Sequence, residues 1–379
     1  MTANSKKTGL ILTGGGARAA YQIGVLKAVD ELLGHPSINP FSILCGTSAG
    51  AVNAGALAIR ADDFAGAVRN LLAVWENFRA HQVYRTDVPA IMRTGAKWLG
   101  MMSLLYRNNP ISLLDNQPLR ELIERTMDFS RIQNNIDNGS LFAVAVTASG
   151  YTSGQSVTFY QGGPGLEAWE RTQRTGAARP LSTDLLMASS SLPFIFPAVK
   201  VHREYFGDGS MRQIAPISPA LHLGADRVLI VGTGRQADQP ARVRSNIYPS
   251  LAQISGHALN SIFLDSLAVD IERLQRINRT LDCVSPEKAK EFGLSLRKVE
   301  VMIISPSQPI ERIAARHLYE LPRTIRFLLR GIGAMNRNGS NLASYLLFER
   351  NFCRDLIELG YQDTLARSAE MLAFLEPEQ

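Results

Sequence analysis

The sequence contains little cysteine and no segment that resembles a secretion signal. Its three cysteines, Cys45, Cys283 and Cys353, lie far apart and form no C-x-x-C pair, which argues against a disulfide framework. The residues before Gly14 include two lysines but too short an apolar run for the h-region of a signal peptide. Reduced thiols and the missing signal together predict a cytoplasmic protein.

The sequence also lacks an apolar run suited to crossing a membrane, and neither charge sign dominates it strongly. The longest stretch without Asp, Glu, Lys or Arg, residues 34–59, is interrupted by prolines and polar side chains, so we expect a buried core segment there. Forty Lys and Arg against thirty-four Asp and Glu leave a formal charge of +6, which favours anionic surfaces without predicting nucleic-acid binding. No cluster of His, Cys or acidic residues has metal-ligand spacing, and we predict neither a metal nor a cofactor.

What the 379 residues do contain is a repeated pattern of strand, turn and helix. Short apolar runs at residues 10–13 and 41–45 predict buried strands, and a helical pattern follows each of them, at 17–33 and 48–59. The pattern predicts an α/β protein with a mainly parallel sheet wrapped by helices. Further strands are expected at 141–147, 157–160, 227–232 and 299–304.

A polar segment after Gly234 divides the sequence into two parts. It contains Pro240 and shows no apolar period, which is typical of a loop. We therefore expect a catalytic core at residues 8–234 and a mostly helical C-terminal region at residues 235–379, to which the strand near 299–304 would belong. Helical spacing in this region is found at 254–281, 321–329 and 342–359.

A G-x-S-x-G pattern follows the second expected strand and places Ser48 between Gly46 and Gly50. Small residues two positions before and after a serine let a strand turn sharply into a helix, which is the context of a nucleophile elbow. The hydroxyl would project above the sheet edge, and the positive end of the following helix would face an oxyanion forming there. Ser48 is therefore the candidate nucleophile.

A serine hydroxyl needs an adjacent base, and the histidines do not supply an evident one. None of the six histidines stands in a convincing turn motif, so a Ser-His-Asp arrangement is not predicted. Asp208, in the segment FGDGSM, is flanked by glycines that let a loop carry its carboxylate up to a serine. Asp208 is the candidate base, and the alternative is an ordinary turn aspartate.

Three consecutive glycines, Gly14 to Gly16, follow the first expected strand. Glycine inside an element costs about 0.5–1 kcal/mol relative to alanine, so such a run indicates that the backbone approaches something closely. Bare N–H groups in this position would hold an anion. A nucleotide-binding loop is the main alternative, but neither G-x-G-x-x-G nor G-K-[ST] is present here.

Four motifs follow one another along the chain: the glycine run with Arg18, the GTSAG turn, the segment ASSSLPFIFPAVK at 188–200 and the DGS aspartate. In this order they resemble the motifs of the bacterial patatin-like phospholipases, which use a Ser-Asp dyad without histidine. The resemblance covers residues 8–234 and implies a three-layer α/β/α core. Two positions depart from the family pattern, since Ala19 replaces a glycine and DGS stands where DGG or DGA is commoner.

The resemblance implies a role for each matched residue. Ser48 would be the nucleophile, Asp208 would take its proton, and Arg18 would order the glycine loop or add positive potential. The oxyanion hole would be formed by the backbone N–H groups of Gly14, Gly15 and Gly16.

The activity that this implies is hydrolysis of a phospholipid or another fatty-acyl ester through an acyl-enzyme, without metal or cofactor. Two other functions remain open. An acyltransferase would pass the acyl group to an alcohol, and a non-catalytic lipid-binding or scaffolding protein would keep the fold alone.

Two segments raise the question of membrane contact. Residues 91–108 gather Trp, Met, Leu and Tyr between basic residues, and they form either a lid or membrane-facing helix or part of the core. Arg316, Arg323 and Arg330 recur every seven residues near Phe327, which fits a basic stripe on anionic lipid or a solvated helix face. The expected partners are a lipid substrate and the inner face of a membrane, with no nucleic acid.

Overall fold

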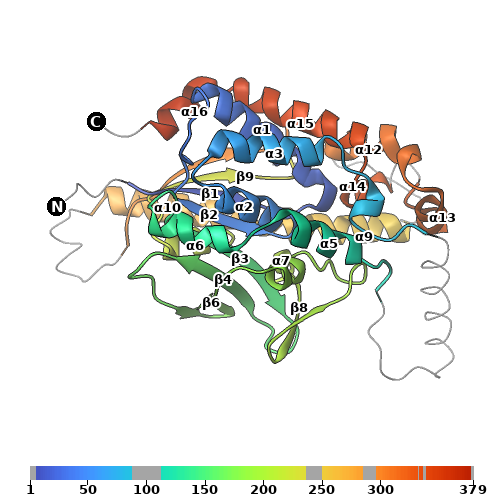
Figure 1. Cartoon of the computed structure of the whole chain (residues 1–379), viewed down its shortest axis with the longest axis horizontal. Coiled ribbons are helices and arrows are strands. Elements are labelled where there is room, and N and C mark those ends of the chain that lie inside the picture. The colour runs from blue at the N-terminus through green and yellow to red at the C-terminus, as the bar shows by residue number, and fades with distance from the viewer. Residues whose placement is uncertain are drawn as a thin grey trace.

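The centre of the molecule is a sheet built on the apolar strands of the sequence (Figure 1). This computed structural model describes residues 6–87, 112–235, 250–284, 296–331, 333–335 and 339–376. The strand order is β10-β9-β1-β2-β3-β4-β6-β5, and the strands from β10 to β3 run parallel. These parallel strands are β10 (Glu300–Ile304), β9 (Arg227–Val231), β1 (Thr8–Leu12), β2 (Ile43–Thr47) and β3 (Ala143–Gly150).

The rest of the sheet is mixed. Residues 151–155 connect β3 to β4 and are too few for a parallel crossover, so this pair is antiparallel. The hairpin of β7 and β8 joins the end of β3, where β8 pairs antiparallel with it. β4 and β6 pair parallel. The α/β prediction is confirmed, with a sheet that is wholly parallel from β10 to β3 and mixed beyond β3. The mixed part contains β4 (Ser156–Gly162), β5 (Trp169–Arg171), β6 (Arg174–Ala178), β7 (Val199–Val201) and β8 (Glu204–Asp208).

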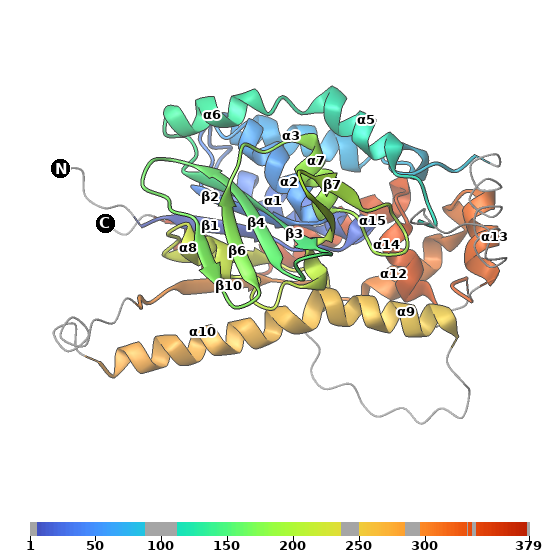
Figure 2. The same cartoon turned by 90° about the horizontal axis from the view of Figure 1, so that it is seen from below.

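Helices cover both faces of the sheet, because side chains alternate along each strand. On β1, Leu10 and Leu12 belong to the buried cluster of one face and Ile11 to that of the other. The two faces with their helices make the three layers (Figures 1 and 2). The first face carries α1 (Ala20–Leu32), α2 (Ala49–Ile59), α3 (Phe64–Trp75) and α15 (Arg350–Leu365), and the second carries α8 (Ser218–His222) and α10 (Ser266–Asp282).

The other helices surround these layers. In the described ranges, none of the helices has the length and apolar character needed to cross a bilayer. The segment 91–108 lies outside the described residues. The longer of the remaining helices are α5 (Gln117–Thr126), α6 (Ser130–Asp137), α7 (Thr183–Ser189), α9 (Leu251–Asn260), α12 (Ile310–His317), α13 (Arg323–Gly331), α14 (Ser340–Leu346) and α16 (Ser368–Leu375). Single turns of 3-10 helix are η1 (Gly16–Ala19), η2 (Ala80–Gln82), η3 (Gly209–Met211) and η5 (Leu318–Glu320).

The C-terminal region contributes to both the sheet and the helical layers. The helical pattern at 254–281 forms one long rod, in which a π-helical turn (Ser261–Asp265) joins α9 to α10 (Figure 2). The pattern at 342–359 forms two helices instead of one, because residues 347–349 leave the helical conformation between α14 and α15. β10 lies at the edge of the sheet beside β9. The C-terminal region thus shares its hydrophobic core with the preceding part of the chain.

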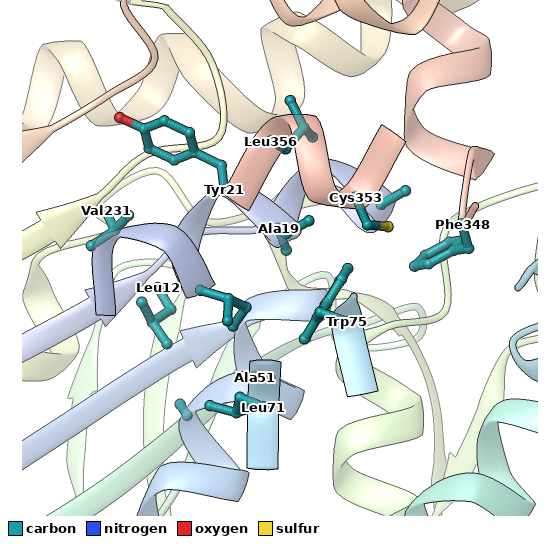
Figure 3. Packing of buried hydrophobic residues seen from close by; sticks show 14 of the residues in the cluster. Leu12, Ala19, Tyr21, Ala51, Leu71, Trp75, Val231, Phe348, Cys353 and Leu356 are labelled. Atoms are coloured by element: carbon teal, nitrogen blue, oxygen red, sulfur yellow. The ribbon is translucent and has the colours of Figure 1, made fainter. Parts of the chain in front are cut away.

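Helix α15 lies directly on α1, and glycines let the two backbones touch. A Cβ added to Gly24 of α1 would overlap the carbonyl oxygen of Ile357, and one added to Gly360 of α15 would overlap that of Tyr21. Leu356 of α15 belongs to the same buried cluster as Tyr21 (Figure 3). The backbones of α1 and α15 are therefore in direct contact at these two glycines.

Replacing Gly24 with alanine is expected to destabilise the protein by about 3 kcal/mol, because the added methyl group forces a backbone carbonyl to move. Thermal unfolding followed by circular dichroism measures the effect. Gly331→Ala is the matched control, since a Cβ at the end of α13 meets nothing within 4 Å. Equal Tm values for the two variants would contradict the close contact of α1 with α15.

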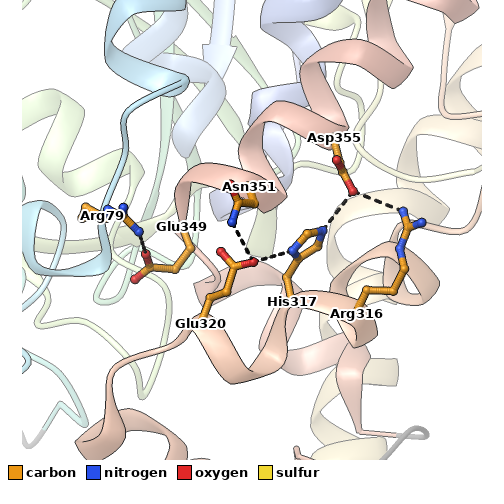
Figure 4. Close-up of polar contacts among 7 residues, drawn as sticks. All are labelled: Arg79, Arg316, His317, Glu320, Glu349, Asn351 and Asp355. Carbon is orange, nitrogen blue, oxygen red and sulfur yellow. Dashed lines mark hydrogen bonds and ion pairs between the residues drawn. The ribbon is translucent and has the colours of Figure 1, made fainter.

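Polar contacts also fix the start of α15 (Figure 4). Glu349, buried at the N-terminus of this helix, accepts a hydrogen bond from Arg79 at 3.0 Å. His317 at the end of α12 lies between Glu320 and Asp355, with its ring nitrogens 2.7 and 2.9 Å from their carboxylate oxygens. These contacts connect α12 and α15 to each other and to the segment after α3.

Candidate active site

Ser48 alone makes the turn from strand β2 into helix α2. Its φ of 56° and ψ of −130° lie in a region of backbone conformation that costs a non-glycine residue about 1–3 kcal/mol. A Cβ on Gly46 would overlap the carbonyl oxygen of Gly50, and one on Gly50 would overlap that of Leu12. The pattern G-x-S-x-G therefore encodes a strained turn in which glycine is needed on both sides of the serine.

A second serine, Ser189, forms a hydrogen bond with the backbone of this turn. The backbone N–H of Ser48 donates to Oγ of Ser189 at 2.9 Å, and the Ser189 hydroxyl donates to the carbonyl of Thr147 at 2.6 Å. Ser189 ends α7 and is fully buried. Sequence reasoning missed this role, and the available signal was the serine run inside ASSSLPFIFPAVK.

Asp208 ends β8 and is fully buried beside Ser48. Its Oδ1 accepts a hydrogen bond from the N–H of Ser210 at 2.9 Å, while Oδ2 has no hydrogen-bonded partner among the described residues. Burial raises the pKa of this carboxyl to about 6, and the nearby hydroxyl of Ser48 and the groups of Ser210 oppose the rise. The carboxylate is thus near enough to Ser48 to interact with its hydroxyl, and one of its oxygens is unused.

The glycine loop adjoins both of these residues. A Cβ on Gly14 would overlap Oγ of Ser210, two positions after Asp208, and Gly16 lines the same cavity as Ser48. The sequence thus brings the three motifs together at the carboxyl ends of the parallel strands, as is usual for sites in α/β proteins.

Among the described residues, the N–H groups of the glycine loop have no hydrogen-bond acceptor, whereas two of its carbonyls accept hydrogen bonds. In the described part of the chain, no hydrogen bond is made by the N–H of Gly14, Gly15 or Gly16. The carbonyl of Gly14 accepts from Thr233 at 2.5 Å, and that of Gly15 accepts from the N–H of Arg18 at 3.1 Å. Unpaired N–H groups on a fixed loop are suited to an anionic oxygen.

Arg18 is buried, and its guanidinium faces the C-terminal region. Nε donates to Ser344 at 2.7 Å, Nη1 donates to Asn260 at 3.3 Å, and Nη2 donates to Asn341. The guanidinium carbon lies 4.0 Å from the ring centroid of Tyr345. This position favours an ordering role over direct contact with an oxyanion, since the donors are used on α9 and α14.

An apolar cavity of about 160 Å³ opens beside Ser48, between α2, α3 and α5. Its walls are mostly aliphatic and aromatic, which suits a hydrocarbon chain. The apolar lining includes Val52, Ala56, Leu71, Val74, Trp75, Leu119, Leu122, Ile123, Met127, Leu192, Phe196 and Phe348.

A buried chain of amides and indole connects this cavity to the glycine loop. Trp75 donates to Asn53 at 2.9 Å, Asn53 donates to Gln22 at 2.9 Å, and Gln22 donates to the carbonyl of Thr13 at 2.7 Å. Thr13 immediately precedes Gly14, so this chain fixes the start of the loop. Sequence reasoning missed it, although two polar residues inside small-residue or apolar helices were a usable signal.

The histidines have other positions. The described lining of the Ser48 cavity contains no histidine. His317 contacts two carboxylates, and His222 stacks on Trp169. Within the described ranges, no group of three or more His, Cys, Asp or Glu side chains is placed to hold a metal ion.

Comparison with known proteins gives a family match and two curated relatives. The family model described as patatin-like phospholipase matches residues 10–221, which is more than half of the chain. The chain is 27% identical over 216 residues to a cGAMP-activated phospholipase of Pseudomonas aeruginosa, covering 56% of this chain and 55% of that protein. It is 32% identical over 95 residues to a cUMP-AMP-activated phospholipase of Escherichia coli, covering 25% of each. The chain thus spans about half the length of the first relative and a quarter of the second.

Two solved structures are similar at a lower level. VipD from Legionella pneumophila is 12% identical with a TM-score of 0.30, and the match covers 94% of this chain and 67% of that one. The type III effector protein ExoU is 13% identical with a TM-score of 0.33, and the match covers 99% of this chain and 55% of that one. Similarity of this degree does not define an activity.

Proposed function

This chain belongs to the patatin-like phospholipase family, and on that basis we propose that it hydrolyses fatty-acyl esters of lipids through a serine acyl-enzyme. The observation that carries the proposal is the position of Ser48. It occupies a strained turn between an apolar cavity and a buried carboxylate with one unpaired oxygen. Strain of this kind is found where the surrounding structure enforces it for function.

In the proposed reaction, the hydroxyl of Ser48 attacks the ester carbonyl while Asp208 takes its proton. The resulting oxyanion accepts hydrogen bonds from the glycine loop, where each donor is worth on the order of 10²–10³ in rate. Collapse breaks the ester C–O bond, the proton on Asp208 passes to the leaving alcohol, and the acyl group stays on Ser48. Water then gives a proton to Asp208 and attacks the acyl carbon, and that proton returns to Ser48 as the fatty acid leaves.

The apolar cavity supports an acyl chain as the recognised part of the substrate. Each methylene group buried there contributes about 0.8 kcal/mol. The walls formed by α2, α3 and α5 offer few polar groups that would read a head group. We therefore propose selection for the acyl chain at this cavity.

Peripheral membrane contact is proposed for α13. Arg316 pairs with Asp355 at 3.2 Å, which removes it from the expected basic stripe. Arg323 and Arg330 are exposed on α13, and the ring of Phe327 between them is 79% exposed. An exposed aromatic side chain between arginines is typical of a surface that binds anionic lipid.

Vesicles of phosphatidylcholine, with or without phosphatidylglycerol, test both proposals. The expected result is release of free fatty acid from both kinds of vesicle and stronger co-sedimentation with the anionic ones. Each assay is run with and without cGAMP and cUMP-AMP, because the two curated relatives are named for activation by these nucleotides.

The product distinguishes the alternative functions. Transfer of the acyl group to an added alcohol in preference to water would identify an acyltransferase. Binding to vesicles without release or transfer under any of these conditions would favour a lipid-binding protein and contradict the proposed hydrolysis. Equal sedimentation with both kinds of vesicle would contradict the role of α13.

A further inference from the structure

A second cavity, of about 390 Å³, lies on the sheet face that α8 and α10 cover. It shares no described lining residue with the cavity beside Ser48. Its walls come from the hairpin of β5 and β6, from α8, from α10 and from the residues before β10. The charged side chains and the histidine in its lining are Arg171, Arg174, Arg273, Arg297, Asp270 and His222, and we call it the arginine cavity.

Positive charge in the arginine cavity exceeds the negative charge available to it. Asp270 supplies the one carboxylate in the described lining, and its Oδ2 already accepts the N–H of Ile217 at 2.9 Å. Arg297 is occupied as well, by Asp226 at 3.5 Å and by two backbone carbonyls. Arg174 and Arg273 both act on the carboxylate of Asp270. Nη1 of Arg171 donates to the backbone carbonyl of Glu170 at 2.9 Å.

Arg174 has a buried donor without a described partner. Its Nε is buried and has no hydrogen-bond partner among the described residues, although buried polar atoms are normally paired. Burial lowers the pKa of its guanidinium, the negative charge of Asp270 opposes this, and the positive charges of Arg273 and Arg171 lower the pKa further. Arg273, on α10, lines the same cavity and interacts electrostatically with Asp270 and Arg174.

The imidazole ring of His222 also lines the arginine cavity. Its ring lies 4.7 Å from the ring of Trp169, at an interplanar angle of 9°, and Trp169 stacks on Tyr160. Burial lowers the pKa of His222, and so do Arg171, Arg174 and Arg297. A neutral imidazole in this position can both donate and accept a hydrogen bond.

We propose that the arginine cavity binds a phosphate-bearing anion, held by the guanidinium groups of Arg171, Arg174 and Arg273. A guanidinium group can bind two phosphate oxygens through two parallel hydrogen bonds. The ammonium group of lysine lacks this planar pair of donors, so arginine suits phosphate better. The anion supplies the negative charge that the cluster lacks and a partner for the buried Nε of Arg174. Phosphate can come from a free small molecule or from a lipid head group, and the experiment separates these two sources.

The test uses the purified full-length chain and pyrophosphate as the probe, at an ionic strength kept constant with sodium chloride. Isothermal titration calorimetry is expected to show saturable binding to one site. Arg174→Ala and Arg273→Ala should each raise the Kd at least tenfold, and Arg174→Lys should recover only part of the loss, since lysine lacks the fork. Arg273 is exposed on a helix, so its variant remains informative if Arg174→Ala does not fold.

Arg276→Ala is the matched control. Arg276 is an exposed arginine on the same helix, paired with Glu272 and absent from the lining of the arginine cavity. Its variant should bind pyrophosphate as the wild type does. No saturable binding, or an equal loss in the Arg276 variant, would overturn the proposal.

A second arm identifies the source of the phosphate. Anionic vesicles are added to the wild-type protein together with pyrophosphate, and the pyrophosphate that stays bound is measured. The Arg174→Ala variant is measured in the same way as a reference for weakened binding. Displacement of pyrophosphate by vesicles would support a lipid head group as the ligand, and its retention would support a free anion. The binding readout does not depend on hydrolysis, so failure of this proposal and failure of the proposed enzyme activity are distinguishable.

Discussion

Replacement of Ser48 with alanine is expected to reduce kcat for ester hydrolysis by roughly 10⁵-fold or more, because the proposed acyl-enzyme forms on the hydroxyl that this substitution removes. The apolar cavity is unchanged by this substitution, so KM should change little. A p-nitrophenyl ester with a long acyl chain measures both constants. A fluorophosphonate probe mapped by mass spectrometry should modify Ser48 in the wild type and leave the variant unmodified.

Two comparisons make this prediction specific. Ser37→Ala changes an exposed serine and should keep full activity. Ser48→Gly should be as inactive as the alanine variant and yet unfold at a higher temperature, because glycine adopts the φ of 56° without strain. Fatty-acid release that survives the loss of the Ser48 hydroxyl would refute the serine mechanism.

Replacement of Asp208 with asparagine is expected to lower kcat/KM by about 10²–10⁴-fold, the usual contribution of a general base. In the wild type, burial raises the pKa of Asp208 to about 6. Only the ionised carboxylate can take the proton of Ser48, so kcat/KM should rise with pH and level off above about pH 7. A pH–rate profile without this step would show that Asp208 is not the base.

The same carboxylate changes the free energy of unfolding in the opposite direction: activity rises with pH, whereas the contribution of Asp208 to stability falls. The folded pKa of Asp208 is raised, so the folded protein keeps this proton over a pH range in which the unfolded chain has lost it. Its contribution therefore falls as pH rises from about 4 to about 6, by up to about 3 kcal/mol, and is constant above that range. Asp208→Asn should match the wild type in Tm near pH 4 and exceed it at pH 8.

Local features of the site were predictable from the sequence because they depend on neighbouring residues. The turn at Ser48 follows from two glycines at fixed positions, and β2 and α2 follow from the apolar patterns on either side of it. The long helical pattern at 254–281 likewise contained enough turns to be recognised, although its π-helical turn at Ser261–Asp265 left no mark in the periodicity.

Features that depend on distant contacts were not predictable. Ser189 matters because its hydroxyl meets the N–H of Ser48, 141 positions earlier in the chain. Trp75, Asn53 and Gln22 are joined only once three helices have packed together. The antiparallel pairs that β3 makes with β4 and β8 were not predicted for a related reason, because apolar strand patterns do not record the direction of pairing.

The hydrogen bonds of Arg18 bear on the order in which the protein is synthesised and folded. The residues that hold its guanidinium, Asn260, Asn341 and Ser344, lie 242, 323 and 326 positions after it. A ribosome therefore produces the glycine run and Ser48 long before it has produced the residues that hold Arg18. The bracing of the glycine loop through Arg18 is therefore complete only after residue 344 has been added to the growing chain.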